Sequence, residues 1–152
     1  MNTSAKESIL AALATALSGV TEANSYSFDF GPRISRGIPQ VNATPALVIF
    51  DGICTAEVVS RVHRHILRIV IEGHVSFTDE SAKSTDRSVL GNAVAADIMQ
   101  GVNSRFSMAG VIVNLISYQV TYDQDLTDSV AATVAYDFIF NTPRIDPNTL
   151  LE

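Results

Sequence analysis

The chain has 152 residues, which is typical of a single domain, and 47% of them are apolar while 17% are charged. This composition excludes a disordered chain and is sufficient for a hydrophobic core without disulfide bonds. Sixteen acidic and ten basic residues give a net charge of −6. A dedicated nucleic-acid-binding protein needs a basic face, so the charge argues against that class. We find no apolar run long enough to cross a bilayer and no signal-peptide pattern at the N-terminus, and therefore expect an intracellular protein without membrane contact.

The charged fraction is low, which indicates surface that an assembly hides. Eight of the ten basic residues are arginine, the basic residue that protein interfaces prefer. The single cysteine, Cys54, excludes an internal disulfide bond and a cysteine-rich metal site. Because Cys54 lies next to an apolar strand, we expect it to be a small buried hydrophobic residue.

The N-terminal part is predicted to form one helix, one extended segment and one loop. Ser4 and Glu7 have the spacing of a capping box, apolar residues then recur at helical spacing, and Gly19 follows, so the pattern predicts a helix over Ala5–Ser18. The aromatic residues of Tyr26–Phe30 alternate with small or polar ones, which indicates a half-buried strand or extended segment. Glycine and proline mark Gly31–Thr44 as a loop, and a loop of that length is often functional.

The stretch Ala46–Phe50 is wholly apolar, follows a proline and precedes Asp51-Gly52. Such a run predicts a short strand that is buried on both faces and ends at a turn. Helices of the same chain can cover one face, and another copy of the chain can cover the other. A long strand is predicted over Val58–Phe77, apolar on one side and polar on the other in its second half, and antiparallel to Ala46–Phe50.

The C-terminal half is predicted to contain a helix and two strands. The helix begins at Thr85 or Asp86 and ends within Gly101–Ser104. The strands span Val111–Tyr122 and Ser129–Phe140, and an acidic hairpin loop joins them. We therefore predict one α+β domain, residues 1–152, with a mixed or mostly antiparallel sheet and two helices packed on one face. Its core spans residues 4–141, and residues 142–152 form a tail.

Two groups of residues invite an interpretation as a metal site, and neither fits one well. His63 and His65 lie two apart on a strand, so both side chains point the same way, but no third ligand is fixed and His74 has the opposite parity. The acidic loop fails as an EF-hand, because the sixth position from Asp123 is Asp128, where that motif needs glycine. We expect no cofactor, no metal and no catalytic residue. A small metal-dependent enzyme using His63 and His65 remains the alternative from a different class.

Charged residues are the candidate contacts with partners or between subunits. Three interpretations stay open for the arginines on the long strand: a solvated sheet face, pairing across subunits with Asp123–Asp128 or Asp79-Glu80, and contact with DNA phosphates. Arg64 and Arg68 share a parity and Arg61 has the other. The candidate residues are Arg33, Arg36, Arg61, Arg64, Arg68, Asp123, Asp125 and Asp128.

Taken together, the order of elements resembles the tail terminator (minor tail) proteins of long-tailed bacteriophages. The resemblance covers residues 4–141 and rests on the N-terminal helix, on Thr44–Phe50, on the strand ending Ile69–Gly73 and on the helix containing Asn92–Ile98. Two final strands, the last ending in Val134–Phe138, complete it. The stretch Tyr26–Val41 and the tail after Pro143 match nothing in the family pattern.

The resemblance implies a structural virion protein without enzymatic activity. Such proteins form a ring, usually a homohexamer, on the last ring of the tail tube, where they end tube growth and join tail to head. The implied partners are the chain itself, the tail tube protein and a head-completion or neck protein, with the tail sheath as a further candidate. Viral DNA would pass through the lumen without specific binding. The implied location is the head-proximal end of the virion tail, after synthesis in the host cytoplasm. Another tail or neck component, either a tube subunit or a head-completion protein, is the nearest alternative.

Overall fold

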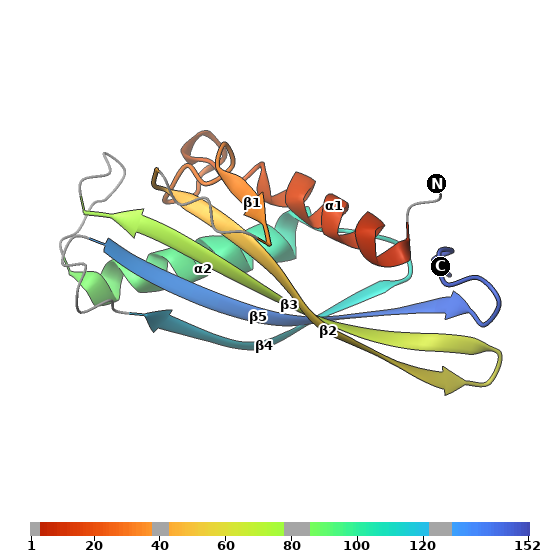
Figure 1. Ribbon diagram of the computed structural model, residues 1–152. Helices are drawn as coiled ribbons and strands as arrows, with labels where there is room; N and C mark the ends of the chain where they lie inside the picture. Colours follow the sequence, from red (N-terminus) through yellow and green to blue (C-terminus); the bar gives the residue numbers. More distant parts are fainter. Residues whose placement is uncertain (1–3, 38–42, 78–85, 122–128) are drawn as a thin grey trace.

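The structure is a computed structural model that describes residues 4–37, 43–77, 86–121 and 129–152. Two helices, α1 (Ala5–Leu17) and α2 (Arg87–Arg105), lie on one face of a five-stranded sheet (Figure 1). The strands are β1 (Ile34–Arg36), β2 (Ala46–Val59), β3 (Val62–Ser76), β4 (Val111–Thr121) and β5 (Ser129–Pro143). Their order across the sheet is β1-β2-β3-β5-β4, and all neighbours are antiparallel except β1 and β2. The predicted α+β class is confirmed.

Both helices begin where the sequence predicts. The Ser4 side chain accepts a hydrogen bond from the Glu7 N–H, and the Asp86 carboxylate accepts from the first turn of α2, so each cap satisfies N–H groups that have no partner inside the helix. The predicted end of α2 is wrong, because the helix continues through Gly101 to Arg105. A Cβ at Gly101 would lie 2.6 Å from a Val20 methyl group, so glycine serves close packing there and does not end the helix.

The core lies between the helices and the inner face of the sheet. Alternate residues of β3 and β5 are buried, as their sequence pattern predicts. Glycine lets α2 approach the strands closely: a Cβ at Gly73 of β3 would lie 2.6 Å from a Val94 methyl group, and one at Gly91 of α2 would lie 2.2 Å from Val120. In the part of the chain that the structure describes, no helix is both long and apolar enough to be a membrane span.

The predicted boundaries of β2 and β3 are wrong. Asp51-Gly52 does not end β2 but lies at a bulge between Asp51 and Cys54, after which the strand continues to Val59. The chain turns at Ser60-Arg61, close to the start of the single long strand that we predicted over Val58–Phe77. Ser60 has a positive φ of 58°, although neither residue of the turn is glycine or asparagine, the types that favour a positive φ. The antiparallel pairing of β2 with β3 is confirmed.

The predicted loop Gly31–Thr44 contains a short strand. The three residues of β1 pair in parallel with Leu47–Ile49, and the Leu47 N–H donates to the Arg33 carbonyl at 2.9 Å. The preceding segment Tyr26–Phe30 is not a strand of the sheet, because its backbone bends at Ser27 and Phe28, and its three aromatic side chains are buried against the core. Together these segments cover the edge of β2 only as far as Ile49.

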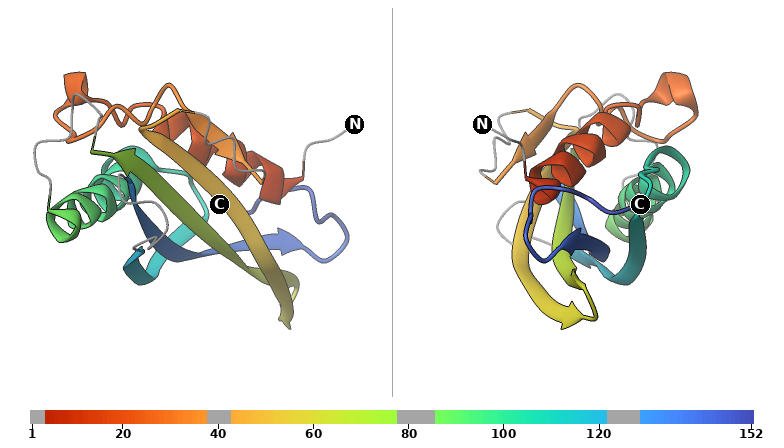
Figure 2. Two further views of the ribbon diagram at one scale, coloured as in Figure 1. Left: turned by 60° about the vertical axis from the view of Figure 1, so that its left-hand side comes forward. Right: turned by 90° about the vertical axis from the view of Figure 1, so that its right-hand side faces the viewer.

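The long strands extend past the helices. With 15 residues, β3 is about 50 Å long, whereas α1 and α2, with 13 and 19 residues, are only about 20 and 28 Å long. The β2–β3 hairpin therefore projects beyond both helices, with the end of β5 beside it (Figures 1 and 2). The sequence from Asp51 to Val58 is exposed throughout, whereas Ala46–Ile49 of the same strand is fully buried.

A test of this burial is Val48→Asp, which places a charge at a fully buried position of β2. An unpaired buried charge costs several kcal/mol, which is comparable with the whole stability of a small domain, so we expect the variant not to fold. Thr55→Asp, on an exposed position of the same strand, is the matched control and should fold. Circular dichroism during thermal unfolding measures both, and cooperative unfolding of Val48→Asp near the wild-type temperature would contradict the burial.

Candidate functional site: an uncovered sheet face and two free edges

Two of the candidate arginines tie the N-terminal segments together. The Arg33 guanidinium donates to the Pro45 carbonyl at 3.4 Å. Arg36 of β1 forms an ion pair with Glu7 of α1 at 3.0 Å, and Lys6 in the same helical turn lies 2.7 Å from Asp51 of β2. The hydrogen bond from Lys6 lowers the pKa of Asp51. These side chains hold the start of α1 against β1 and β2.

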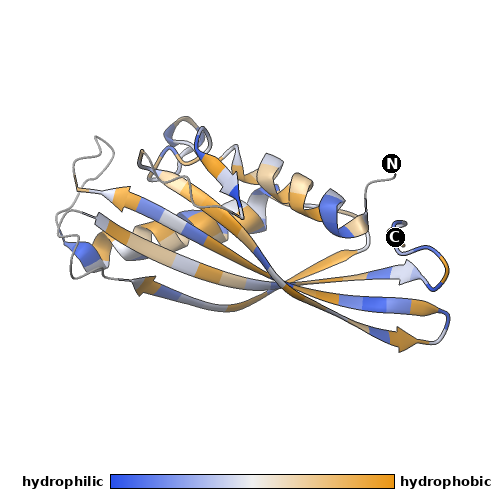
Figure 3. Ribbon diagram, in the orientation of Figure 1, coloured by the Kyte–Doolittle hydropathy of each residue, from blue (hydrophilic) through white to orange (hydrophobic). Residues whose placement is uncertain are grey.

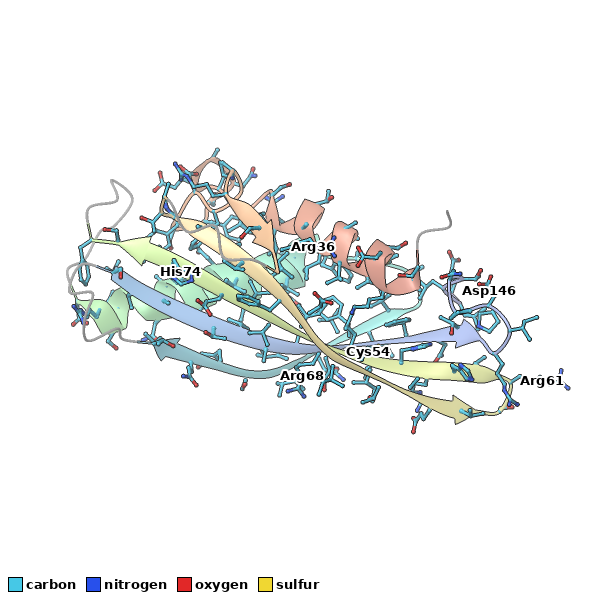
Figure 4. All side chains as sticks on the ribbon, in the orientation of Figure 1. Arg36, Cys54, Arg61, Arg68, His74 and Asp146 are labelled. Atoms are coloured by element: carbon cyan, nitrogen blue, oxygen red, sulfur yellow. The ribbon has the colours of Figure 1, made fainter. Side chains whose placement is uncertain are left out.

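The arginines of the hairpin are arranged differently from the prediction. Arg68 lies 2.6 Å from Asp137 on β5, and this hydrogen bond raises the pKa of Arg68, while Arg64 lies 3.5 Å from Glu57 on β2. Both pairs join neighbouring strands of one chain. Arg61 belongs to the turn, not to a strand face, and lies at the hairpin tip (Figure 4). The acidic candidates Asp123, Asp125 and Asp128, like Asp79-Glu80, lie outside the described residues, so pairing across subunits stays a prediction.

The two histidines of the hairpin point the same way, as their spacing predicts, with ring centroids 6.3 Å apart. His65 stacks on Phe140 at 4.8 Å, and its Nε2 lies 2.8 Å from the Thr142 hydroxyl. Burial and the neighbouring His63 both lower the pKa of His65. Among the described residues, no group of three or more His, Cys, Asp or Glu side chains has the arrangement of a metal site. The contacts of His65 are those of a packing residue in the hairpin.

Cys54 is exposed, so the prediction of a buried side chain is wrong. The reason is its position after the bulge in β2, in the part of the strand that extends beyond the helices. Its neighbours in sequence are exposed too, among them Ile53 with 79% of its surface accessible.

The outer face of the sheet, which neither helix covers, carries a row of apolar side chains. In the register of the sheet, Ile112 of β4 is opposite Ile139 of β5, which is opposite Ile66 of β3, which is opposite Thr55 of β2. Ile112 is 61% exposed and the two central isoleucines are partly buried. We call these four residues, with Ile53 beside them, the apolar row.

The Arg68–Asp137 ion pair borders the apolar row. Its two side chains line a shallow depression of about 340 Å³ together with Ile53, Thr55 and Ile66. Hydrophobic and hydrophilic residues are mixed along the strands of the projecting part of the sheet (Figure 3). Of the residues in this region, arginine is enriched in protein interfaces, whereas aspartate is depleted there.

On the inner side of the sheet, an apolar groove runs between α2 and the edge strand β4. Its volume is about 500 Å³, and its apolar lining consists of Met99, Val102, Phe106, Val113, Leu115 and Tyr136. Leu115 is 49% exposed and Tyr118, on the same side of β4, is 54% exposed. The groove lies beside an edge of the sheet that has no strand partner in the part of the chain described.

A residue that we did not single out, Asp97 of α2, fixes the aromatic segment Tyr26–Phe30. Its carboxylate is buried and accepts hydrogen bonds from the backbone N–H groups of Ser27, at 3.1 Å, and Phe28, at 3.0 Å. Burial raises the pKa of Asp97, and those hydrogen bonds oppose the rise. The only feature of the sequence that could have indicated this role is the position of Asp97, an acidic residue among the apolar positions of the predicted helix.

No protein-family model matches this chain, and no curated protein matches it.

The role of Asp97 can be tested by substitution. Asp97→Ala leaves two N–H groups without their acceptor, so we expect the free energy of unfolding to fall by roughly 2 kcal/mol or more. Asp97→Asn keeps one side-chain oxygen as acceptor and should lose less. Urea unfolding at neutral pH compares the two variants, and equal loss in both would contradict the hydrogen-bonding role.

The same carboxylate predicts a pH dependence. Because the pKa of Asp97 is raised above 3.8 on folding, the folded chain binds this proton more tightly than the unfolded chain does. The wild-type stability, relative to that of Asp97→Asn, should therefore decrease as the pH rises from below 3.8 through the raised pKa. Unfolding free energies of both proteins at a series of pH values measure the difference, and an increase over that range would contradict it.

The Arg36–Glu7 pair predicts a small effect on stability, because both side chains are exposed. Arg36→Glu should change the free energy of unfolding by less than about 1 kcal/mol. Combined with Arg33→Glu it should leave the single chain folded and weaken assembly, provided that these side chains contact a partner. Chemical unfolding measures the first effect and sedimentation velocity the second, and unchanged assembly would remove both arginines from the interface.

Proposed function

We propose that the chain is a structural protein of a phage tail, of the tail-terminator kind, which forms a ring and caps the end of the tail tube. The observation that carries the proposal is the apolar row, on a sheet face that neither α1 nor α2 covers. A protein that acts as a soluble monomer rarely keeps such a surface open, and proteins that do so use it to bind other proteins. The resemblance of the sequence to tail terminators supplies the kind of assembly.

On this proposal the chain works by binding and does no chemistry. Copies join around an axis, and a head-to-tail contact that closes on itself gives a ring of fixed size. One side of the ring binds the last ring of the tube, and the opposite side does not offer the surface that a further tube ring requires. Tube growth then ends, and the free side is available to a head-completion or neck protein.

The net charge of −6 agrees with such a role. DNA must slide through the lumen of a tail, so a lumen that binds phosphates tightly would hinder its passage. The arginines near the apolar row support the same view, since Arg64 and Arg68 already pair with carboxylates of their own chain.

Electron microscopy of the purified protein, alone and mixed with tail tubes, tests the function. We expect rings of one size and tubes capped at one end. Open-ended filaments of the protein alone would instead identify a tube subunit. A monomer that leaves tubes uncapped would contradict the proposal.

Substitutions in the apolar row test the observation that carries the proposal. Ile53→Lys combined with Ile112→Lys places two charges in an apolar contact while leaving the fold intact, because both side chains are more than half exposed. We expect the double variant to remain folded and monomeric. Val89→Lys, at a position of α2 that is 53% exposed, is the matched control and should assemble normally. Sedimentation velocity measures all three proteins, and full assembly of the double variant would rule out the row as a contact.

A further inference from the structure

Two strand segments of the chain are exposed on both of their faces. In β2 this segment is Asp51–Val58, and in β4 it is Asn114–Gln119. Both contain large apolar residues that protrude into solvent, and these are Ile53, Val58, Leu115, Ile116 and Tyr118. A strand with apolar residues on both faces is normally found inside a sheet that is covered on both faces.

Both segments also lie at edges of the sheet. β4 is the last strand on one side, and on the other side β1 pairs only with Leu47–Ile49 of β2. The whole of β4 carries no charged side chain and no proline. In the distal part of β2 the charged residue Glu57 is paired with Arg64 of the same chain. Soluble proteins usually protect an exposed edge with lysine, proline or a covering segment, so two such edges indicate strands that pair in an assembly.

We infer that the distal part of β2 (Ile53–Val58) in one copy adds as an antiparallel strand to β4 of the next copy. The directions of the strands favour this pairing. β2 is antiparallel to β3, β3 to β5, and β5 to β4, so β2 and β4 run in opposite directions at the two sides of the sheet. A second sheet placed beside the first in the same orientation therefore brings its β2 antiparallel to β4, which extends the ladder without reversing a copy.

The side chains of the two edges are complementary in this arrangement. On the inner side, the small residues Cys54 and Ala56 and the larger Val58 face the same way as the groove between α2 and β4. That groove has about 500 Å³ of space and is lined by six apolar or aromatic side chains together with the polar Gln100 and Asn103. On the outer side, Ile53 of the next copy lies on the same face of the extended sheet as Ile112. One contact thus covers apolar residues on both faces of both strands.

Pairing of β4 with β4 of a second copy is the main alternative, and it explains less. Such a pair is symmetric, so it covers one edge of each chain and leaves the distal part of β2 exposed in both. Pairing of β2 with β4 covers both edges with a single kind of contact and allows closure into a ring. The inference depends on the proposed function only in requiring that copies of the chain assemble.

The native cysteine makes the test direct, because Cys54 is exposed and lies on the inferred pairing segment. A second cysteine is introduced on the same side of β4, in separate variants Val111→Cys, Leu115→Cys and Tyr118→Cys, which sample the possible registers. Strands that pair bring opposed Cα atoms within the roughly 4.4–6.8 Å that a disulfide bond requires. Ala11→Cys on the exposed face of α1 is the control. Each full-length variant is oxidised mildly and separated by non-reducing electrophoresis.

We expect at least one β4 variant to form a ladder of disulfide-linked chains that ends at the size of the ring. The linked fraction should exceed that of the control by about tenfold or more, because pairing raises the effective concentration of the two thiols. Adding Cys54→Ala should abolish the ladder. Dimers that persist with Cys54→Ala would show β4–β4 pairing and overturn the inference, and so would a linked fraction equal to the control in every variant.

Electron microscopy of the same samples separates the two proposals. Rings that cap tubes without any cross-link through Cys54 would overturn the pairing of β2 with β4 and leave the proposed function standing. A Cys54-dependent ladder from rings that do not cap tubes would leave the pairing standing and contradict the terminator function.

Discussion

The difference in length between the strands and the helices determines which surfaces of this molecule are left exposed. Strands of 14 and 15 residues lie under helices of 13 and 19 residues. Each residue adds more than twice as much length to a strand as to a helix. The helices can therefore cover only part of one face, and the β2–β3 hairpin must extend into solvent. Among the described residues, the two helices leave the outer face, the hairpin and the free edge of β4 uncovered.

The covered part of the molecule is held by specific polar contacts as well as by apolar packing. Asp97 fixes the aromatic segment before β1, and Lys6 and Arg36 link the start of α1 to β2 and its neighbours. These contacts set where the N-terminal segments stop, which is at Ile49 on the edge of β2. The exposed half of β2 begins directly after this point. The division of β2 into a buried half and an exposed half is what connects the fold to the proposed assembly.

The sequence predicted the fold class because burial leaves a periodic pattern. The alternation along β5 and the caps at Ser4 and Asp86 depend on local chemistry, and each was visible in the residues themselves. The errors lie where tertiary contacts override local preference. Asp51-Gly52 resembles a turn but forms a bulge, and Ser60-Arg61 forms a turn without glycine, proline or asparagine. Gly101 resembles a helix end but serves a close helix contact.

The candidate site was predicted in part. We expected the arginines to contact partners, which stays a prediction; Arg64 and Arg68 pair within the chain, and a sequence cannot show which strands will be neighbours. The apolar row could not be predicted, because it exists only in the register that joins β2, β3, β5 and β4. The exposure of Cys54 could not be predicted either, because it depends on how far the helices extend along the sheet.

Hydrogen exchange of the backbone amides tests most directly whether the free edges are covered in an assembly. The exchange rates along β4 and the distal part of β2 are compared between the assembled protein and the monomeric Ile53→Lys/Ile112→Lys variant, with the buried strand β3 as internal reference. Coverage predicts that both edges exchange much more slowly in the assembly while β3 is unchanged. Equal exchange at both edges in the two states would mean that these strands stay open, and that copies of the chain do not meet there.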